Sequence, residues 1–374
     1  MAGQPSWRVA SNSVETFVTE TGGHVGPTTF KLARRAVQPY SVAPWAKERL
    51  DPGTPNILRV LRGDFFCLPF GGNDTPYRGE RHPAHGETAN GRWRFDSLEK
   101  KDGITTFRAS LKTKVRAGSV QKEISVADGQ TVIYSRHIIS GMNGPMNLGH
   151  HAMLKFPDHP GSGLLSTSRM VYGQVLPAVF ESPEKRGYSF LKPGAEFNSL
   201  ASVPAANGER ADLSRYPARR GYEDLVMLVN DDSVAMAWTA VAFPKERFVW
   251  FALKNPRVLR ETVFWISNGG RHYPPWNSRH VNVMGLEEVT SYFHFGLAES
   301  TRKNPVSEKG FPTVLQLSPR RPLAVSYIMG VAEIPAGFDH VESITPDSGE
   351  AGITFKSRNG KSARATVHCN FLQP

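Results

Sequence analysis

The stretch TVIYSRHII, residues 131–139, is the clearest indication of the fold class. It is rich in β-branched and aromatic side chains, which favour strands. Successive side chains of a strand point to opposite faces of a sheet. One face would carry Val132, Tyr134, Arg136 and Ile138, and the other Ile133, Ser135, His137 and Ile139. Asp128-Gly129, just before the stretch, is a pair typical of tight hairpins, so we expect a strand of an antiparallel sheet.

Similar short runs recur along almost the whole chain of 374 residues. Turn pairs such as Asp102-Gly103 and Asn359-Gly360 separate them, and the 34 glycines and 28 prolines favour turns over helices. One or two helical turns are expected, over Trp45–Leu50. We therefore predict a mostly β chain, a large antiparallel β-sandwich with few short helices, in a single domain over residues 1–374. The expected strands are 57–61, 104–111, 122–126, 131–139, 225–229, 234–240, 248–253, 263–266, 281–286, 289–295, 313–317, 323–328, 353–356 and 365–369.

The composition limits the classes of partner. A net charge of +11 is compatible with nucleic acid, a membrane surface or an anionic substrate. However, the basic residues are scattered and form no nucleic-acid-binding motif, so we expect no nucleic-acid partner and leave an anionic sugar open. The chain has no apolar stretch of membrane-spanning length and no signal-peptide pattern at its N-terminus. We expect a cytoplasmic protein without a membrane partner; the oligomeric state stays open.

Residues 62–95, RGDFFCLPFGGNDTPYRGERHPAHGETANGRWRF, combine a glycine turn, histidines, a carboxylate and aromatic rings. Glycine lets a backbone approach a ligand closely, and histidine exchanges protons near neutral pH. Tryptophan offers an apolar face with a polar edge. These parts suit a polar, ring-shaped ligand such as a sugar, for which Arg62, Asn73, His85 and Trp93 are candidate contacts.

Two further segments carry titratable groups next to strand-like apolar runs. The first is NLGHHAMLKF, residues 147–156, and the second is GLEE, residues 285–288. A histidine and a carboxylate on one sheet surface would make an acid–base pair. The alternative is that each of these groups is structural.

A metal site is a competing interpretation of the histidines. His82, His85, Glu87 and a later histidine could form a cupin-type site. The spacing argues against it, because ligands on one strand face are two residues apart, whereas His82 and His85 differ by three and flank a proline. We expect no metal.

Three motifs resemble the aldose 1-epimerase (galactose mutarotase-like) superfamily. NLGHHAMLKF resembles the strand that carries the family's catalytic histidine, with His151 in that place. LPFGG, residues 68–72, followed by PAHGETANGRW, residues 83–93, resembles the related hexose-6-phosphate 1-epimerases, with His85 and Trp93 at roughly matching places. VMGLEEV, residues 283–289, resembles the strand of the catalytic glutamate, with Glu287 in that place. The motifs occur in the family's order and span most of the chain.

The resemblance implies a β-supersandwich and the interconversion of α and β anomers of a hexose or hexose derivative. Glu287 would act as base on the anomeric hydroxyl, His151 as acid on the ring oxygen, and His85 would hold the sugar. No metal or organic cofactor would be needed, and a nearby carboxylate would raise the pKa of His151. Ala89 stands where the sugar-phosphate branch has an arginine, although Arg62, Arg81 or Arg92 could replace it.

The loop NGGRHYPPWNSRH, residues 268–280, supplies further candidates. Tryptophan stacks on sugar faces, and arginine and asparagine form hydrogen bonds with hydroxyls. We expect Arg271, Trp276 and Asn277 to contact the substrate. Two alternatives to an epimerase stay open: a non-catalytic carbohydrate-binding protein, and a metal-dependent sugar isomerase or lyase on a β scaffold.

Overall fold

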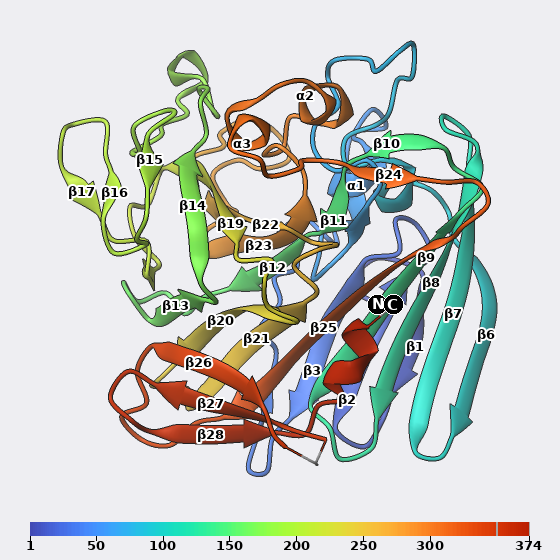
Figure 1. Cartoon of the computed structure of the whole chain (residues 1–374), viewed down its shortest axis with the longest axis vertical. Coiled ribbons are helices and arrows are strands. Elements are labelled where there is room, and N and C mark those ends of the chain that lie inside the picture. The colour runs from blue at the N-terminus through green and yellow to red at the C-terminus, as the bar shows by residue number, and fades with distance from the viewer. Residues whose placement is uncertain (349–350, 374) are drawn as a thin grey trace.

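The computed structural model describes residues 1–348 and 351–373. Antiparallel strands dominate it, and two large sheets pack face to face (Figure 1). In the nine-stranded sheet the order is β18 (Arg215–Tyr216), β13 (Gly163–Thr167), β20 (Ala237–Phe243), β21 (Phe248–Lys254), β25 (Leu323–Glu333), β9 (Val132–Ser140), β8 (Gly118–Ala127), β7 (Ile104–Thr113) and β6 (Arg94–Lys101).

The eight-stranded sheet carries the strands of the motifs that contain His151 and Glu287. Its order is β15 (Glu196–Phe197), β14 (Met170–Val175), β19 (Glu223–Asn230), β22 (Glu261–Ser267), β23 (Val283–Thr290), β11 (Leu148–His150) and β5 (Phe66–Cys67), and β12 (Ala152–Lys155) also pairs with β23. Its central strands β19, β22 and β23 are buried on both faces, and they bury polar as well as apolar side chains.

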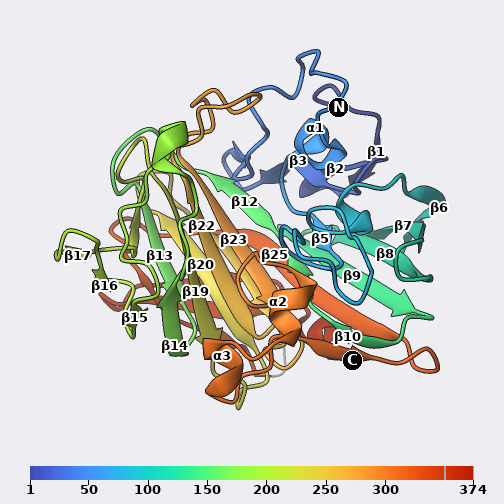
Figure 2. The same ribbon diagram turned by 90° about the horizontal axis from the view of Figure 1, so that it is seen from above.

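Smaller sheets and helices cover the large sheets (Figures 1 and 2). One small sheet contains β1 (Ser6–Ala10), β2 (Val14–Thr19), β3 (Val25–Lys31) and β4 (Ala36–Val37), and another β26 (Val341–Pro346), β27 (Ile353–Ser357) and β28 (Ser362–Ala365). Two pairs are β10 (Gly144–Met146) with β24 (Leu315–Leu317) and β16 (Val203–Pro204) with β17 (Arg210–Ala211). The helices are α1 (Asn56–Val60), α2 (Leu297–Thr301) and α3 (Pro305–Glu308).

The two faces of the eight-stranded sheet have different surroundings. On β19, β22 and β23, even-numbered residues such as Leu228, Phe264 and Leu286 pack into the core between the two large sheets. Odd-numbered residues such as Met227 and Val263 face a second core, closed by α1 and by loops. The outer face of the nine-stranded sheet is covered by β26, β27 and β28. The site lies on the face of the eight-stranded sheet that carries Met227 and Val263 and is closed by α1 and by loops.

The stretch 131–139 has the predicted alternation. Val132 and Tyr134 belong to the core under the C-terminal sheet, whereas Ile133 and Ile139 belong to the core between the large sheets. Asp102 and Gly103 both have positive φ, at 50° and 77°, as a primed hairpin turn requires. The large antiparallel β-sandwich is thus confirmed.

Several expected elements are wrong. Residues 57–60 of the strand expected over 57–61 belong to α1 instead, because Ile57 and Val60 bury one face at helical spacing. Residues 45–50 form a turn but no helix. The two strands expected over 281–295 are one strand, β23, which lies between Asn282 and Phe293, both at positive φ. The strand expected over 365–369 ends at Ala365, and a 3-10 helix follows at Cys369–Leu372.

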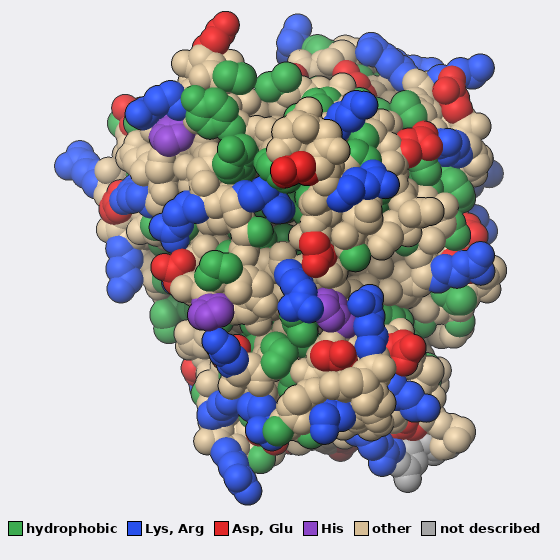
Figure 3. All heavy atoms as spheres, turned by 90° about the vertical axis from the view of Figure 1, so that its left-hand side faces the viewer, with side chains coloured by type: hydrophobic (Ala, Val, Ile, Leu, Met, Phe, Trp, Pro, Cys, Tyr) green, Lys and Arg blue, Asp and Glu red, His purple; other side chains and the backbone are tan. Residues whose placement is uncertain are grey.

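Two surface features bear on partners. Within residues 1–348 and 351–373, no helix combines the length and the apolar character needed to cross a membrane. Lysine and arginine side chains are spread over the face in Figure 3, with aspartate and glutamate among them. The scattered basic residues of the sequence thus stay scattered on this face.

Candidate active site

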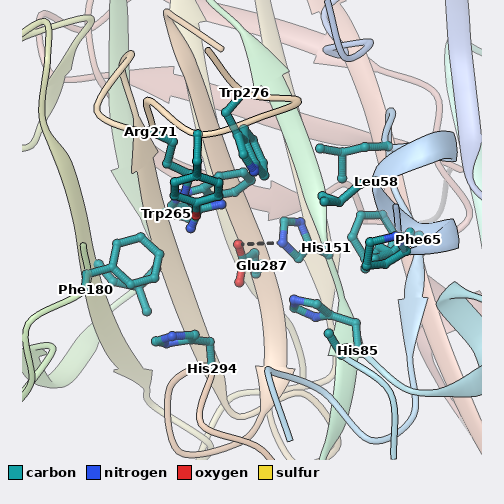
Figure 4. A pocket seen from close by; sticks show the side chains of 16 residues that line it. Leu58, Phe65, His85, His151, Phe180, Trp265, Arg271, Trp276, Glu287 and His294 are labelled. Carbon is teal, nitrogen blue, oxygen red and sulfur yellow. Dashed lines mark ion pairs between the residues drawn. The ribbon is translucent and has the colours of Figure 1, made fainter. Parts of the chain in front are cut away.

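A cavity of about 290 Å³ lies on the loop-covered face of the eight-stranded sheet. Its floor comes from β19, β22, β23 and the junction of β11 with β12, and its walls come from α1 and from loops (Figure 4). The lining residues are Pro55, Ile57, Leu58, Leu61, Phe65, Ala84, His85, His151, Phe180, Leu225, Trp265, Arg271, Tyr273, Trp276, Glu287 and His294.

His151 and Glu287 meet at the floor of the cavity. Gly149 pairs with Val289 and Ala152 with Leu286, so the register places residue 151 opposite residue 287. Residues opposite each other on antiparallel strands have neighbouring side chains. His151 Nε2 lies 3.1 Å from Glu287 Oε1, and the two side chains are only 6% and 2% exposed (Figure 4). The structure therefore joins the two residues that the motifs singled out.

Local packing holds both side chains. The amide of His151 donates to the carbonyl of Phe65 between β11 and β12, and the imidazole stacks on the Phe65 ring at 4.5 Å. The carboxylate of Glu287 folds back over Gly285, where an added Cβ would stand 2.5 Å from Oε1. Glycine at this position leaves the space that the carboxylate occupies.

Burial brings the pKa values of the pair toward each other. It raises the pKa of Glu287 well above its usual value and lowers that of His151 well below its own. The sequence led us to expect a raised pKa for His151, and this is wrong because desolvation by burial dominates and His85 lowers the pKa further. The pair is ionic when the shared proton is on His151 and neutral when it is on Glu287. Burial disfavours charged groups, so it reduces the usual preference for the ion pair.

Arg271 lies in a box of aromatic rings at the wall of the cavity. Its guanidinium carbon is 4.5 to 5.1 Å from the ring centres of Trp276, Trp265 and Phe180. Nε donates to Glu181 Oε1 at 2.6 Å and lies 3.8 Å from Glu223 Oε2.

The charge of Arg271 is balanced by these carboxylates. Burial opposes the charge, but Glu223 and Glu181 raise the pKa of Arg271 overall. Arg271 in turn favours the ionised form of Glu287.

Two further imidazoles face the cavity in neutral form. Burial lowers the pKa of His85 to about 3 and that of His294 to about 4. The amide of Gly71 donates to His85 Nδ1, so the proton of neutral His85 sits on Nε2. His85 is thus a hydrogen-bond donor through Nε2.

Four of the expected substrate contacts do not line the cavity. Arg62 is fully buried and donates to the carbonyls of Val60, Met1 and Ala2. Trp93 is buried and donates to the carbonyl of Thr88.

Asn73 and Asn277 are the other two expected substrate contacts that do not line the cavity. The Asn73 side chain bonds backbone groups of Gly71, Pro83 and Leu297, which makes it a structural brace. Asn277 lines a neighbouring hollow. Of the arginines considered for a phosphate, Arg62, Arg81 and Arg92, none is among the described residues that line the cavity.

The histidines and the carboxylate weighed as a metal site do not converge. His82 contacts Glu80 at 2.9 Å, and Glu87 accepts from the amides of Lys114 and Val115. Across residues 1–348 and 351–373, no group of three or more His, Cys, Asp or Glu could hold a metal ion. The cupin-type arrangement is therefore not formed by these residues.

Several lining residues were missed from the sequence. Trp265 sits inside the apolar run of β22, where a core side chain and a site side chain look alike. Phe65 and Phe180 come from loops, and His294 comes from the loop after β23, where the sequence had predicted a strand. The polar segment over residues 201–222 contains the short strands β16, β17 and β18 and supplies none of the described lining residues.

Comparisons with known proteins identify the fold. No family model matches the chain, and no curated protein matches its sequence. Solved structures do: a candidate aldose 1-epimerase of Escherichia coli K12 has 11% identity and a TM-score of 0.58 over 88% of this chain and 99% of that one. A galactose mutarotase related enzyme of Lactobacillus acidophilus has 12% identity and a TM-score of 0.54 over 87% and 97%. A galactose mutarotase-like protein of Clostridium acetobutylicum has 11% identity and a TM-score of 0.52 over 87% of this chain and 95% of that one. The chain thus has the fold of the aldose 1-epimerase and galactose mutarotase-like proteins, as its motifs indicated.

Proposed function

We propose that the protein is an isomerase that interconverts the α and β anomers of a cyclic hemiacetal, with Glu287 and His151 as its acid–base pair. The observation that carries the proposal is the contact of 3.1 Å between His151 Nε2 and Glu287 Oε1 at the floor of the cavity. The shared fold of candidate epimerases and mutarotases supports it, although fold alone does not determine function.

The chemistry needs one group to remove a proton while another delivers one. In the ion-pair form, Glu287 takes the proton of the anomeric hydroxyl and the imidazolium of His151 protonates the ring oxygen. The ring bond breaks, and the anomeric carbon becomes an aldehyde carbon that can rotate. When the ring recloses on the other face, His151 takes its proton back and Glu287 returns its own.

The buried environment suits this cycle. After ring opening the pair is neutral, and before it the pair is ionic, so a reversible reaction needs the two forms to be close in free energy. Burial raises the pKa of Glu287 and lowers that of His151, which narrows the difference between the forms. Arg271, near Glu287, limits this effect by favouring the carboxylate.

The test is the rate of anomer exchange, measured by NMR exchange spectroscopy with and without protein across free and phosphorylated hexoses. We expect acceleration by the native protein and its loss in Glu287→Gln and in His151→Asn. The matched control is Glu261→Gln, because Glu261 is a buried glutamate on the same face of the same sheet that does not line the cavity. A Glu287→Gln protein with full activity would refute the proposal. Sugar binding without acceleration would favour a carbohydrate-binding protein.

The remaining expectations from the sequence belong to the same proposal. The partner would be a small carbohydrate, with no nucleic-acid or membrane partner, and the chain would act as a single domain over residues 1–374. A cytoplasmic location stays a prediction.

A further inference from the structure

The polar groups of the cavity are unusually few for a site that binds a free sugar. Eleven of its sixteen lining residues are aliphatic or are Phe, Tyr or Trp, and the described lining set contains no Asp, Asn, Gln, Ser, Thr or Lys. Side chains of these kinds are among the usual hydrogen-bond partners of hydroxyls. Hydroxyls that are buried without partners lose their hydration at a cost.

The polar groups that do line the cavity are largely engaged. Glu287 and His151 would serve the anomeric hydroxyl and the ring oxygen. The Tyr273 hydroxyl donates to Glu181, and Arg271 is held by Glu181 and by three aromatic rings. Neutral His85 and His294 and the terminal N–H groups of Arg271, whose Nε donates to Glu181, are left for the other hydroxyls of a hexose.

The cavity also lacks a free positive charge. Arg271 is the one arginine or lysine among the described lining residues, and the carboxylates of Glu181 and Glu223 lie 2.6 and 3.8 Å from its Nε. A phosphate or carboxylate on the substrate would meet a cation that is already paired. An anionic sugar is therefore disfavoured.

Apolar surface continues from the floor to the rim. Trp265 and Leu225 lie on the strands of the floor, Trp276 and Phe180 on loops, and Leu58 on α1 (Figure 4). Leu58 also lines a neighbouring hollow, and Phe180 and Tyr273 line another, so a hollow adjoins the cavity on each of these two sides. A substituent on the sugar ring could extend along either side.

From this lining we infer the substrate class: an uncharged cyclic hemiacetal that carries an apolar substituent, such as an aryl or alkyl ether of an aldose. This inference deepens the proposed function and rests on it. Its ring would present the anomeric centre to His151 and Glu287, and its substituent would pack against Leu58, Trp276 and Phe180.

The experiment compares D-glucose, its 3-O-benzyl and 6-O-benzyl ethers, and glucose 6-phosphate, all with a free anomeric hydroxyl. Isothermal titration calorimetry with the full chain gives the Kd of each. Burial of most of a phenyl group strengthens binding by roughly tenfold or more. We therefore expect one benzyl ether to bind at least about tenfold more tightly than glucose, and the phosphate to bind no more tightly than glucose.

A matched pair of variants locates the effect in the cavity. Leu58→Asn replaces an apolar side chain at the rim by an amide that can form hydrogen bonds with a sugar hydroxyl. It should therefore reduce the preference for the benzyl ether over glucose. Phe311→Asn is the control, because Phe311 is also partly buried against the same core but lines neither the cavity nor the two neighbouring hollows. An unchanged preference in Leu58→Asn would overturn the placement of the substituent.

The binding experiment tests the substrate class, and the rate experiment tests the proposed reaction, so the two claims can fail independently. Glucose or its phosphate binding as tightly as the benzyl ethers, or no binding by any probe, would overturn the substrate class. Tight binding of a benzyl ether without faster anomer exchange would support the substrate class of the cavity and overturn the proposed reaction.

Discussion

Replacing Gly285 by alanine should damage the reaction much more than the fold. Gly285 lies on β23, two residues before Glu287 and on the same face. The added Cβ would stand 2.5 Å from Glu287 Oε1 and 3.1 Å from the Cβ of Trp265. Ordinary contacts begin near 3.4 Å, so the carboxylate must move by about 0.9 Å. Because Oε1 is the end of a flexible side chain, the carboxylate can move away at little cost to the fold.

The magnitude follows from the role of that carboxylate. Misplacing a reacting group by about 1 Å costs on the order of a hundredfold in rate. Alanine also loses less backbone entropy than glycine in a strand, by roughly 0.5–1 kcal/mol, which offsets part of the contact with Trp265. We expect Gly285→Ala to lower kcat/KM for anomer exchange about a hundredfold and to change the free energy of unfolding by less than about 1 kcal/mol.

The assay pairs NMR exchange rates with urea unfolding on the same samples. Gly173→Ala is the control, since Gly173 lies on β14 of the same sheet and an added Cβ would meet the ring of Phe197 at 2.7 Å. It should destabilise the fold and leave the exchange rate unchanged. The double variant Gly285→Ala with Glu287→Gln should be no slower than Glu287→Gln alone. A Gly285→Ala protein with the native rate would refute the proposed role of the Glu287 carboxylate.

Three further predictions concern the buried polar groups. Lys254→Met should lower the free energy of unfolding in urea by about 3–5 kcal/mol, because it leaves the carboxylate of Glu288 buried without its ion pair; adding Glu288→Leu should recover most of the loss, and no recovery would contradict the pairing. Burial raises the pKa of Glu261 from 4.5 to about 8, so between these pH values the folded form holds a proton that the unfolded form has released. Relative to Glu261→Gln, the free energy of unfolding is therefore greatest below pH 4.5 and falls by on the order of 5 kcal/mol as the pH rises toward about 8. Parallel pH profiles of the two proteins would contradict this. Asn73→Ala should lower the melting temperature, since it removes bonds to three backbone groups at a residue with φ of 59°; loss of about 2–3 kcal/mol is expected from calorimetry, and an unchanged melting temperature would argue against the brace.

The neighbouring pairs His150-His151 and Glu287-Glu288 show how far the sequence reaches. Side chains alternate along a strand, so only one member of each pair can face the cavity. His151 and Glu287 do so, while His150 bonds Asp64 at 2.8 Å and Glu288 pairs with Lys254 in the core. Alternation alone leaves the choice of face open, and the resemblance of the motifs made that choice.

The walls of the cavity were harder to predict. Arg271 and Trp276 were predicted from a loop dense in ligand-type residues, and both line the cavity. The same kind of argument failed for Asn277, which lines a neighbouring hollow, and for Trp93, which is buried elsewhere. Composition shows that a loop carries suitable groups, but it does not show the direction in which each group points.

The sequence by itself determined the class of fold and most strand positions, because alternation and turn pairs are local signals that a strand needs wherever it lies. It also marked His151, Glu287 and His85 through ordered motifs. Only the tertiary structure decided that residue 151 lies opposite residue 287, that Arg271 is boxed by three rings, and that Leu58 and Phe180 close the cavity. These contacts join segments far apart in the chain, and they depend on sheet register and loop packing, which local periodicity does not encode.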